Sequence, residues 1–381
     1  MFVLKGKKNV LLSIICMLSL MLSLALLAGC GEEKTKAETG SVTLEYATKF
    51  KIENLADNCK KVTDGEGREL LLVPRGQEAP SEYKDKDLPV INTPVKRVVA
   101  LSTTQASLLR PLDELGSIVA ATTAEESWFM DEMKEGLKSG KIELVGSGMG
   151  PLDFDKIVAL KPDIVFLNTG SAADTESLRK LEELKVPVAV DNAWLENDPL
   201  GRMEWVKFLA AFYEKGDKAD QVFQNTVNKT EEITKKVASA KTKPKVLWGM
   251  IYQGKVYVPD GDSYAAKMIE MAGGDYLFTD KKGGGEITLE EYYARGKEAD
   301  IYMSDTLPQY GVSSIAKITE QGKVLADLKT VKEGKVWCYQ PWYYESLDKT
   351  DEIIADLGAI FHPELFPDAE LKQFKQLPKT D

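Results

Sequence analysis

The stretch DKADQVFQNTVNKTEEITKKVASA, residues 217–240, is the one around which the rest of the chain is organised. Asp217 is placed to cap the first turn, and Pro244 stops the helix because it disfavours helical geometry in Lys243. At about 1.5 Å per residue the helix is roughly 36 Å long, so it is either a long core helix or a connector between two lobes. Small and apolar residues recur every three or four positions, the spacing of one helix face, at Ala219, Val222, Phe223, Thr226, Val227, Thr230, Ile233 and Val237.

Short apolar strands alternate with helices on both sides of this segment. Before it, the pattern predicts strands at 95–102, 118–121, 144–145, 163–167 and 186–190 and helices at 104–115, 154–160, 175–184 and 203–214. After it, the pattern predicts strands at 245–252, 256–258, 300–303 and 335–339 and helices at 263–271, 289–297, 314–320 and 350–361. Continuous apolar strands alternating with helices are typical of parallel sheets covered on both faces.

The sequence therefore predicts an α/β protein with two doubly wound lobes, at 93–216 and 242–381, joined by a single linking helix at 217–241. Residues 42–92 add a short β-rich extension, because two extended runs flank the turn Thr63-Asp64-Gly65-Glu66-Gly67. Residues 76–94, with their prolines and charges, are expected to form a surface connection.

The N-terminus has the composition of a secretory signal at 1–29, followed by a polar tether at 30–41. Three lysines precede an uncharged run at 10–27, which ends in Leu27-Ala28-Gly29-Cys30. These last four residues resemble the lipobox of bacterial lipoproteins, in which the cysteine is lipidated after cleavage. An uncleaved transmembrane anchor is the alternative, since the run is close to spanning length. Both place the rest of the chain outside the cytoplasm.

Charge and cysteine usage exclude several classes of partner. The formal net charge of the 381-residue chain is −11, and loss of the three signal lysines makes it more negative, so nucleic-acid binding is not expected. Cys59 and Cys338 lie in distant segments, which favours two buried free thiols over a disulfide. The spacing of the cysteines matches no metal site, so we expect no direct metal ligation and no cofactor.

Catalysis is poorly supported, which weakens the alternative of a secreted hydrolase. His362 is the single histidine, so a zinc pair of histidines cannot form, and the predicted first lobe has no histidine for a Ser-His-Asp triad. The sequence around Ser263 lacks the final glycine of a nucleophile elbow, and this serine is better placed to cap a helix.

A binding site is better supported, because loops expected beyond the carboxyl ends of the strands carry hydroxyl, amide and aromatic groups. Singly, each aromatic ring is explained by core packing, but several rings in loops suit a large, flat or partly apolar ligand. We expect Thr103, Thr104 and Asn168 to contact polar edges of the ligand. Its body is expected to pack against Trp128, Trp194, Tyr264, Trp342 and Tyr343. The remaining candidate contacts are Arg202, Tyr252 and Ser263.

Several motifs together resemble the substrate-binding lipoproteins of ABC importers that serve iron–siderophore complexes and cobalamin. They are KRVVALS (96–102), IVALKPD (157–163), PLGRMEW (199–205) and ADL (355–357) followed by HPELF (362–366). The resemblance runs from about residue 95 to the C-terminus. It implies a monomer with two lobes joined by one long helix, a shallow ligand cleft between them and little closure on binding.

The resemblance also implies partners. Permease subunits with a cytoplasmic ATPase would receive the ligand, and one surface carboxylate per lobe would dock onto permease arginines. By motif these carboxylates are Asp155 and Glu290, and Asp155 is shorter than the usual glutamate.

The expected function is reversible capture of a metal-chelate nutrient outside the membrane, without catalysis, by a protein anchored through lipid on Cys30. The family's commonest role favours an iron(III)–siderophore complex. Cobalamin, another corrinoid or haem is the alternative, because the loops offer aromatic walls and few basic residues. A surface sensor is the remaining alternative that is not an enzyme.

Overall fold

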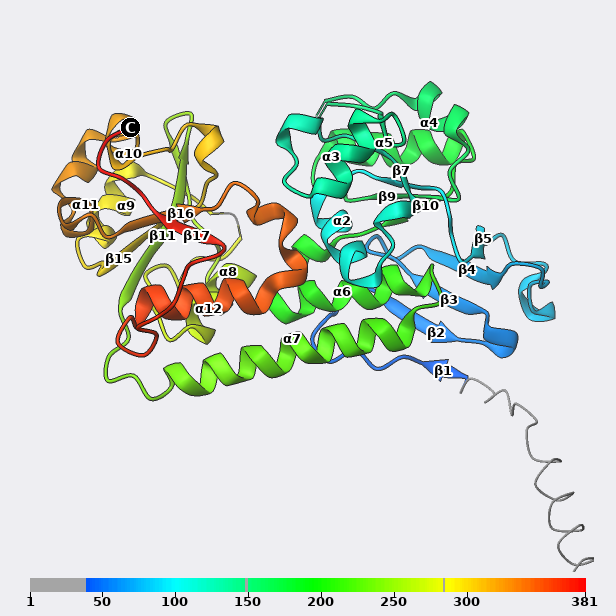
Figure 1. The fold of residues 1–381 in the computed structure, drawn as a ribbon, viewed down its shortest axis with the longest axis horizontal. Coiled ribbons are helices and arrows are strands. Elements are labelled where there is room, and N and C mark those ends of the chain that lie inside the picture. Colours follow the sequence, from blue (N-terminus) through cyan, green and yellow to red (C-terminus); the bar gives the residue numbers. More distant parts are fainter. Residues whose placement is uncertain (1–38, 148–149, 284) are drawn as a thin grey trace, which may run out of the picture. The chain divides into compact units, whose positions relative to one another are not determined.

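The computed structural model describes residues 39–147, 150–283 and 285–381, and Thr39–Asp381 forms one compact unit. The predicted signal, Cys30 and most of the predicted tether lie outside the described residues. Within the described part of the chain, no helix combines the length and the apolar character that crossing a membrane requires. Three sheets organise the unit (Figure 1).

The first lobe contains an entirely parallel sheet in the order β10-β9-β6-β7-β8. Its strands are β6 (Val98–Ala100), β7 (Ile118–Ala121), β8 (Glu143–Leu144), β9 (Ile164–Leu167) and β10 (Val188–Val190). The connecting helices are α2 (Thr103–Leu109), α3 (Asp131–Lys138), α4 (Phe154–Leu160), α5 (Ala172–Glu183) and α6 (Pro199–Ala211). The predicted strand–helix alternation and parallel sheet are confirmed here.

The second lobe has a parallel centre with antiparallel edges, in the order β14-β12-β11-β15-β16-β17, and β13 pairs with β11. Its strands are β11 (Lys245–Tyr252), β12 (Lys255–Tyr257), β13 (Asp275–Tyr276), β14 (Glu286–Ile287), β15 (Ile301–Ser304), β16 (Val336–Tyr339) and β17 (Phe374–Gln376). The helices are α8 (Tyr264–Met271), α9 (Leu289–Gly296), α10 (Ile315–Gln321), α11 (Lys329–Glu333) and α12 (Thr350–Phe361). The pattern did not predict β13, β14 and β17, because two or three residues are too few to show a period.

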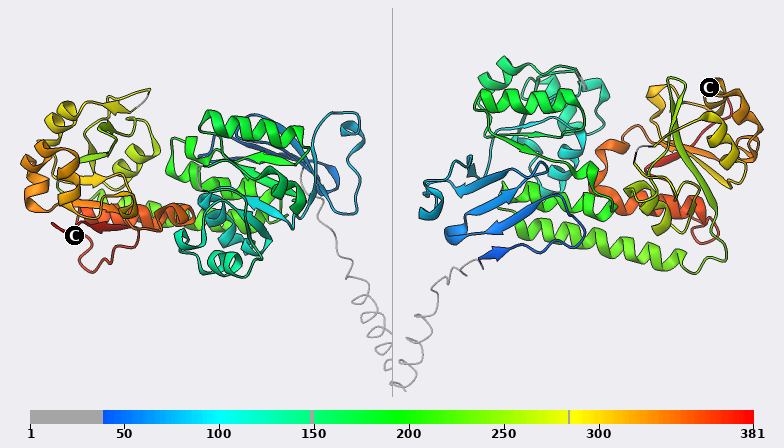
Figure 2. Two further views of the ribbon diagram at one scale, coloured as in Figure 1. Left: turned by 90° about the horizontal axis from the view of Figure 1, so that it is seen from above. Right: turned by 180° about the vertical axis from the view of Figure 1, so that it is seen from behind.

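The N-terminal extension is a five-stranded sheet rather than a single hairpin. Its strands are β1 (Gly40–Ser41), β2 (Lys51–Asn54), β3 (Lys60–Thr63), β4 (Glu69–Pro74) and β5 (Val90–Thr93). β5 lies inside the predicted surface connection and pairs with β4 in parallel. Figure 2 shows this sheet beside α6 and α7, and the ring of Phe50 packs 4.7 Å from that of Trp205 on α6. Cys59 and Cys338 are buried free thiols, as predicted.

Two buried carboxylates of the α6 region hold the segment that leads into β2. Glu204 accepts hydrogen bonds from the backbone amides of Glu45, Tyr46 and Ala47, at 2.8–2.9 Å for the shortest contact of each. Glu196 accepts the amides of Thr48 and Lys49, both at 2.9 Å. We call residues 45–49 the strap. Gly201 has no side chain under the strap, and a Cβ there would lie 3.0 Å from the carbonyl oxygen of Tyr46.

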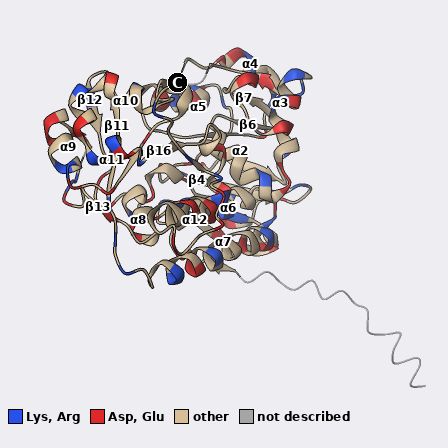
Figure 3. Ribbon diagram, turned by 60° about the vertical axis from the view of Figure 1, so that its left-hand side comes forward, with Lys and Arg blue, Asp and Glu red and all other residues tan. Residues whose placement is uncertain are grey.

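The predicted long helix is present as α7 (Gly216–Val237), and its predicted inner face is the one that packs. Phe223, Thr226, Val227 and Thr230 are buried, and charged residues of both signs lie along the helix (Figure 3). The predicted cap is wrong: the N-cap is Lys215, which makes no side-chain cap, and Asp217 lies inside the first turn.

α7 contributes to the hydrophobic cores of both lobes. Phe223 and Val227 belong to the core of the first lobe, whereas Ile233 packs against the core of the second. The helix lies alongside α6 of the first lobe and α12 of the second (Figure 1). Of the two predicted alternatives, connector fits these contacts better than a core helix of one lobe.

Candidate functional site

Polar contacts tie the two lobes together near the carboxyl ends of their strands. The buried carboxylate of Glu345 accepts the backbone amides of Phe129 at 2.9 Å and Met130 at 2.8 Å. Arg110 on the first lobe pairs with Asp348 at 2.6 Å. Both acids lie between β16 and α12, in the short helices η9 (Tyr343–Glu345) and η10 (Leu347–Lys349). These contacts hold the loop before α3 against the second lobe.

Aromatic rings from both lobes meet at this contact. Phe129 and Trp342 lie edge to face with their centroids 5.8 Å apart. Phe129 is 40% exposed and Tyr344 is 42% exposed, so both rings are available to a ligand. Thr103 donates to the carbonyl oxygen of Tyr344 at 3.1 Å, which fixes the loop after β6 beside them. We call Phe129, Trp342 and Tyr344 the aromatic junction.

Three predicted residues line one small cavity next to the junction. Thr104 on α2, Arg202 on α6 and Tyr343 on η9 surround a space of about 20 Å³, which is room for about one water molecule. The guanidinium carbon of Arg202 lies 3.9 Å from the centroid of the Tyr264 ring, a cation–π contact between the lobes. The structure therefore brings Thr104, Arg202, Tyr264 and Tyr343 together.

The structure corrects the prediction that Trp128 packs against the ligand. Its side chain is 1% exposed and belongs to the core of the first lobe, and its indole nitrogen donates to the carbonyl oxygen of Thr123 at 2.9 Å. The ring is therefore part of the protein interior, and its neighbour Phe129 takes the exposed position. A loop has no hydrophobic period, so the sequence did not indicate which of the two rings points outward.

The other predicted contacts are spread over the molecule. Trp194 is 43% exposed and lies against Gly170, where a Cβ would be 3.2 Å from the indole. Asn168 is half-buried at the end of β9. Tyr252 is 56% exposed at the turn between β11 and β12. Ser263 caps α8 as predicted, accepting the amide of Ala266 at 3.3 Å.

Phe129, Tyr344 and Glu345 are functional candidates that the sequence did not single out. The run Pro341-Trp342-Tyr343-Tyr344 was a signal for Tyr344, since three consecutive aromatic rings cannot all face one side. Nothing local pointed to Glu345, because its partners lie more than two hundred residues away in the chain.

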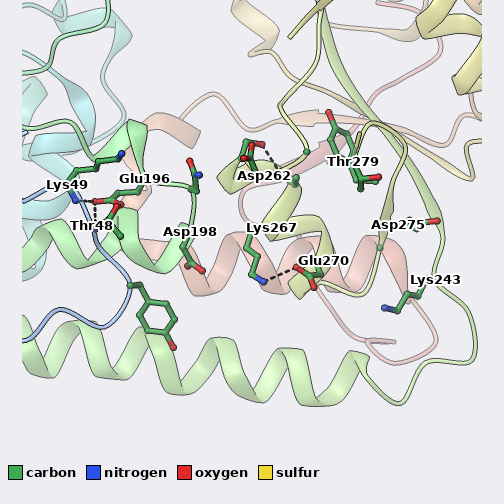
Figure 4. Close-up of a pocket in the computed structure, with 17 residues that line it drawn as sticks. Thr48, Lys49, Glu196, Asp198, Lys243, Asp262, Lys267, Glu270, Asp275 and Thr279 are labelled. Carbon is green, nitrogen blue, oxygen red and sulfur yellow. Dashed lines mark hydrogen bonds and ion pairs between the residues drawn. The ribbon is translucent and has the colours of Figure 1, made fainter. Parts of the chain in front are cut away.

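Ser263 also lines a second, larger cavity of about 720 Å³ on the side of the strap. Figure 4 shows its charged walls, with Lys49 and Asp198 on one side and Asp262 and Asp275 on the other. Lys267 in this wall pairs with Glu270 at 2.8 Å. Among the described residues that line it, Tyr46 and Tyr276 are the aromatic ones.

Asp191, in the loop between β10 and α6, is 3% exposed and accepts the amide of Ala193 at 3.0 Å. Burial raises the pKa of this carboxyl to about 6, against the opposing effects of the Ala193 amide and the nearby Arg202 charge. The charged form is therefore unfavourable in the folded protein.

We expect Asp191 to make the protein less stable as the pH rises from about 4 to about 6. The pKa of Asp191 in the folded protein is higher than the value of about 3.9 that is usual for an exposed Asp. Protonation of this carboxyl therefore stabilises the folded protein fully below a pH of about 3.9. This stabilisation is lost as the pH rises through the folded pKa of about 6. The difference amounts to about 2–3 kcal/mol. Urea unfolding at pH 4.5 and 7.0 should show this fall, and Asp191→Asn should reduce it, whereas the exposed control Asp85→Asn should not. Equal pH dependence in all three proteins would contradict the assignment.

The predicted docking carboxylates occupy equivalent positions in the two lobes. Asp155 is the second residue of α4 and Glu290 is the second residue of α9, and both are exposed. Each helix is capped one residue before its start, by the side chains of Asp153 and Thr288. Within the described residues, neither Asp155 nor Glu290 forms an ion pair.

Metal ligation by the chain itself finds no support in the described residues, which contain no group of three or more His, Cys, Asp or Glu side chains able to hold an ion. The arrangement can therefore bind a molecule through rings, hydroxyls and one arginine.

Comparison with known proteins places this geometry in a family. A model of the periplasmic binding protein family matches residues 98–341. The chain is 34% identical over 319 residues to an uncharacterised lipoprotein of Methanocaldococcus jannaschii, covering 81% of this chain and 75% of the relative. The fold is similar to that of a molybdate-binding periplasmic protein of Haemophilus influenzae, with a TM-score of 0.59, 15% identity and 82% and 94% of the two chains covered.

A periplasmic heme-binding protein of Pseudomonas aeruginosa has a similar fold as well, with a TM-score of 0.57, 19% identity and 75% and 100% of the two chains covered. Because the identities are this low, the two structures support similarity of fold only. The family match covers the sheet of the first lobe, α7 and the second sheet as far as β16. The strap, the extension sheet, α12 and β17 lie outside it. The chain belongs to the periplasmic binding protein family.

Proposed function

We propose that the protein captures a metal-chelate nutrient, in the first place an iron(III)–siderophore-type complex, and delivers it to an ABC permease. As a member of this family the chain is a solute-binding protein, and permease subunits with their ATPase are its partners. The observation that carries the ligand proposal is the aromatic junction, where exposed rings of both lobes converge. Exposed rings suit a large, partly apolar ligand.

A corrinoid is the second candidate, because the exposed groups at the junction are rings rather than basic side chains. Haem ligated by a tyrosine of the junction is less well supported. Partial burial and the negative charge of Asp305 raise the pKa of Tyr344, which opposes the phenolate form that an iron ligand requires. Anchoring through lipid on Cys30 remains part of the proposal, as does an extracytoplasmic location.

The first experiment is to purify the protein from cells and to measure its absorbance spectrum and metal content. A ferric chelate, a corrinoid and haem have different spectra, so the class of ligand follows directly. A preparation that is colourless, free of metal and without affinity for any of these classes would contradict the proposal.

Once the ligand is known, Phe129→Ala and Trp342→Ala should each weaken its affinity by about 5–30-fold, because each removes a ring worth roughly 1–2 kcal/mol at the site. Isothermal titration calorimetry measures the change. Tyr83→Ala, in the extension, is the matched control and should leave affinity unchanged. Loss of affinity in Asp262→Ala, with both junction variants unaffected, would place the ligand in the larger cavity instead.

A further inference from the structure

Arg202 is the one arginine whose side chain forms neither an ion pair nor a hydrogen bond within the part of the chain that the structure describes. All seven arginines lie in the described residues, and the other six donate to a carboxylate or a backbone carbonyl. Those six are Arg68, Arg75, Arg97, Arg110, Arg179 and Arg295. Arg202 forms no ion pair and no side-chain hydrogen bond with any described residue, and its Nε atom is buried without an acceptor.

Arg202 is half-buried, and its Nε atom has lost contact with water without gaining a hydrogen-bond acceptor, which costs free energy. Stacking on Tyr264 at 3.9 Å compensates one face of the group but leaves its N–H donors unused. Asp191 is close enough for the two charges to interact, yet it accepts from the Ala193 amide and not from Arg202. The free donors of Arg202 therefore point to an acceptor from outside the chain.

The cavity beside Arg202 is suited to one anionic oxygen. Its volume of about 20 Å³ is close to the space that one water needs, which is also the size of a carboxylate or phosphate oxygen. The hydroxyls of Thr104 and Tyr343 can donate hydrogen bonds into it. Thr350, the first residue of the 12-residue helix α12, lines the same cavity, and no side chain caps that helix. The positive end of the α12 dipole adds to the attraction for an anion.

We propose that Arg202, with the Thr104 hydroxyl, binds an anionic oxygen of the ligand, so that the protein selects chelates with a free carboxylate or a comparable oxyanion. This inference rests on the proposed function in placing the ligand at the aromatic junction. The rings contact the body of the chelate, and Arg202 selects its charge. An uncharged chelate of similar size would gain only the ring contacts.

The test compares Arg202→Met with Arg179→Met, which removes one positive charge from the exposed surface of α5. Methionine keeps the aliphatic stem of Arg202. The probes are ferric citrate, an uncharged ferric trihydroxamate, cyanocobalamin, and free molybdate and phosphate. Binding of ferric citrate should weaken about 10–100-fold in Arg202→Met, the effect expected for lost hydrogen bonds to a charged group. The affinity of the uncharged probes should not change.

Thermal unfolding of the ligand-free protein separates this role from a structural one. Loss of an unpaired charge should leave the melting temperature of Arg202→Met unchanged or raise it, whereas loss of a structural contact should lower it. A lowered melting temperature together with equal loss of affinity for charged and uncharged probes would overturn the inference.

The remaining outcomes distinguish the inference from the proposed function. If ferric citrate binds equally well to the wild type and Arg202→Met, the inference is wrong and the proposed function stands. If only free molybdate or phosphate binds, and Arg202→Met abolishes it, the anion site is supported and the metal-chelate proposal is wrong. Binding of none of the probes to the wild type contradicts both.

Discussion

Glu204→Ala is expected to lower the free energy of unfolding by about 3–5 kcal/mol, the cost typical of breaking a buried charged network from one side. The carboxylate is fully buried and accepts three consecutive amides of the strap, and Lys207 lies 3.1 Å from it. Without it, three N–H donors lose their acceptor and Lys207 keeps only Asp220, at 3.3 Å, and each lost partner costs free energy. Urea unfolding of the wild type and the variant measures the difference.

Two further variants make the interpretation specific. Glu232→Ala removes an exposed carboxylate from α7 and should be nearly neutral. Glu204→Gln keeps the shape with one acceptor oxygen and should fall between the two. Hydrogen exchange of the amides of Glu45, Tyr46 and Ala47 should accelerate in Glu204→Ala. A variant as stable as Glu232→Ala, with the strap amides still protected, would show that the carboxylate is not needed to hold the strap.

Reversal of both docking carboxylates, Asp155→Lys with Glu290→Lys, is expected to reduce uptake of the ligand to background while binding is unchanged. Both side chains are exposed and equivalently placed at the starts of α4 and α9. Lysine in place of each acid turns attraction toward permease arginines into repulsion, which suppresses a charge-complementary complex. Uptake of labelled ligand by cells that carry the cognate transporter measures the effect.

The matched control reverses two exposed acids elsewhere, Asp85→Lys with Asp368→Lys, and so changes the net charge by the same amount. Uptake with this control should remain close to that of the wild type, and immunoblots should show equal amounts of protein at the membrane. If both double variants lose uptake equally, net charge and not docking explains the loss. Weakened ligand binding by the purified Asp155→Lys, Glu290→Lys protein would also contradict the docking role.

The sequence predicted the elements whose side chains follow a regular period. α7 was found because one face is buried while charged residues cover the rest, so its period is strong. α6 was found from its apolar run, in which Trp205, Phe208, Leu209 and Phe212 are all fully buried. Its start was placed four residues late, because Asp198 and Pro199 were assigned to the preceding loop. Proline is well tolerated at the first position of a helix.

The contacts that build the candidate site were harder to predict, because they join residues that are distant in the chain. The sequence could have indicated that Glu204 has distant partners. It lies between Met203 and Trp205 in a helix that is buried on nearly all sides, so its carboxylate needs hydrogen-bond donors from another segment. Its partners are separated from it by about 160 residues and lie in a segment without periodicity. Trp128 and Phe129 differ in exposure for a similar reason, as the amide contacts of Glu345 decide which ring turns outward.

The helix shared by both cores has a consequence for the speed of binding. α7 packs into the two lobes, and Glu345 and Asp348 tie them a second time, so we expect little movement between the empty and the loaded protein. No slow closing step then limits association, which is set by diffusion to a site that already has its shape. Differences in affinity between chelates should appear as differences in residence time. A ligand that leaves slowly from this protein does so because of its own contacts, and release at the membrane requires the permease to separate lobes that the chain holds together.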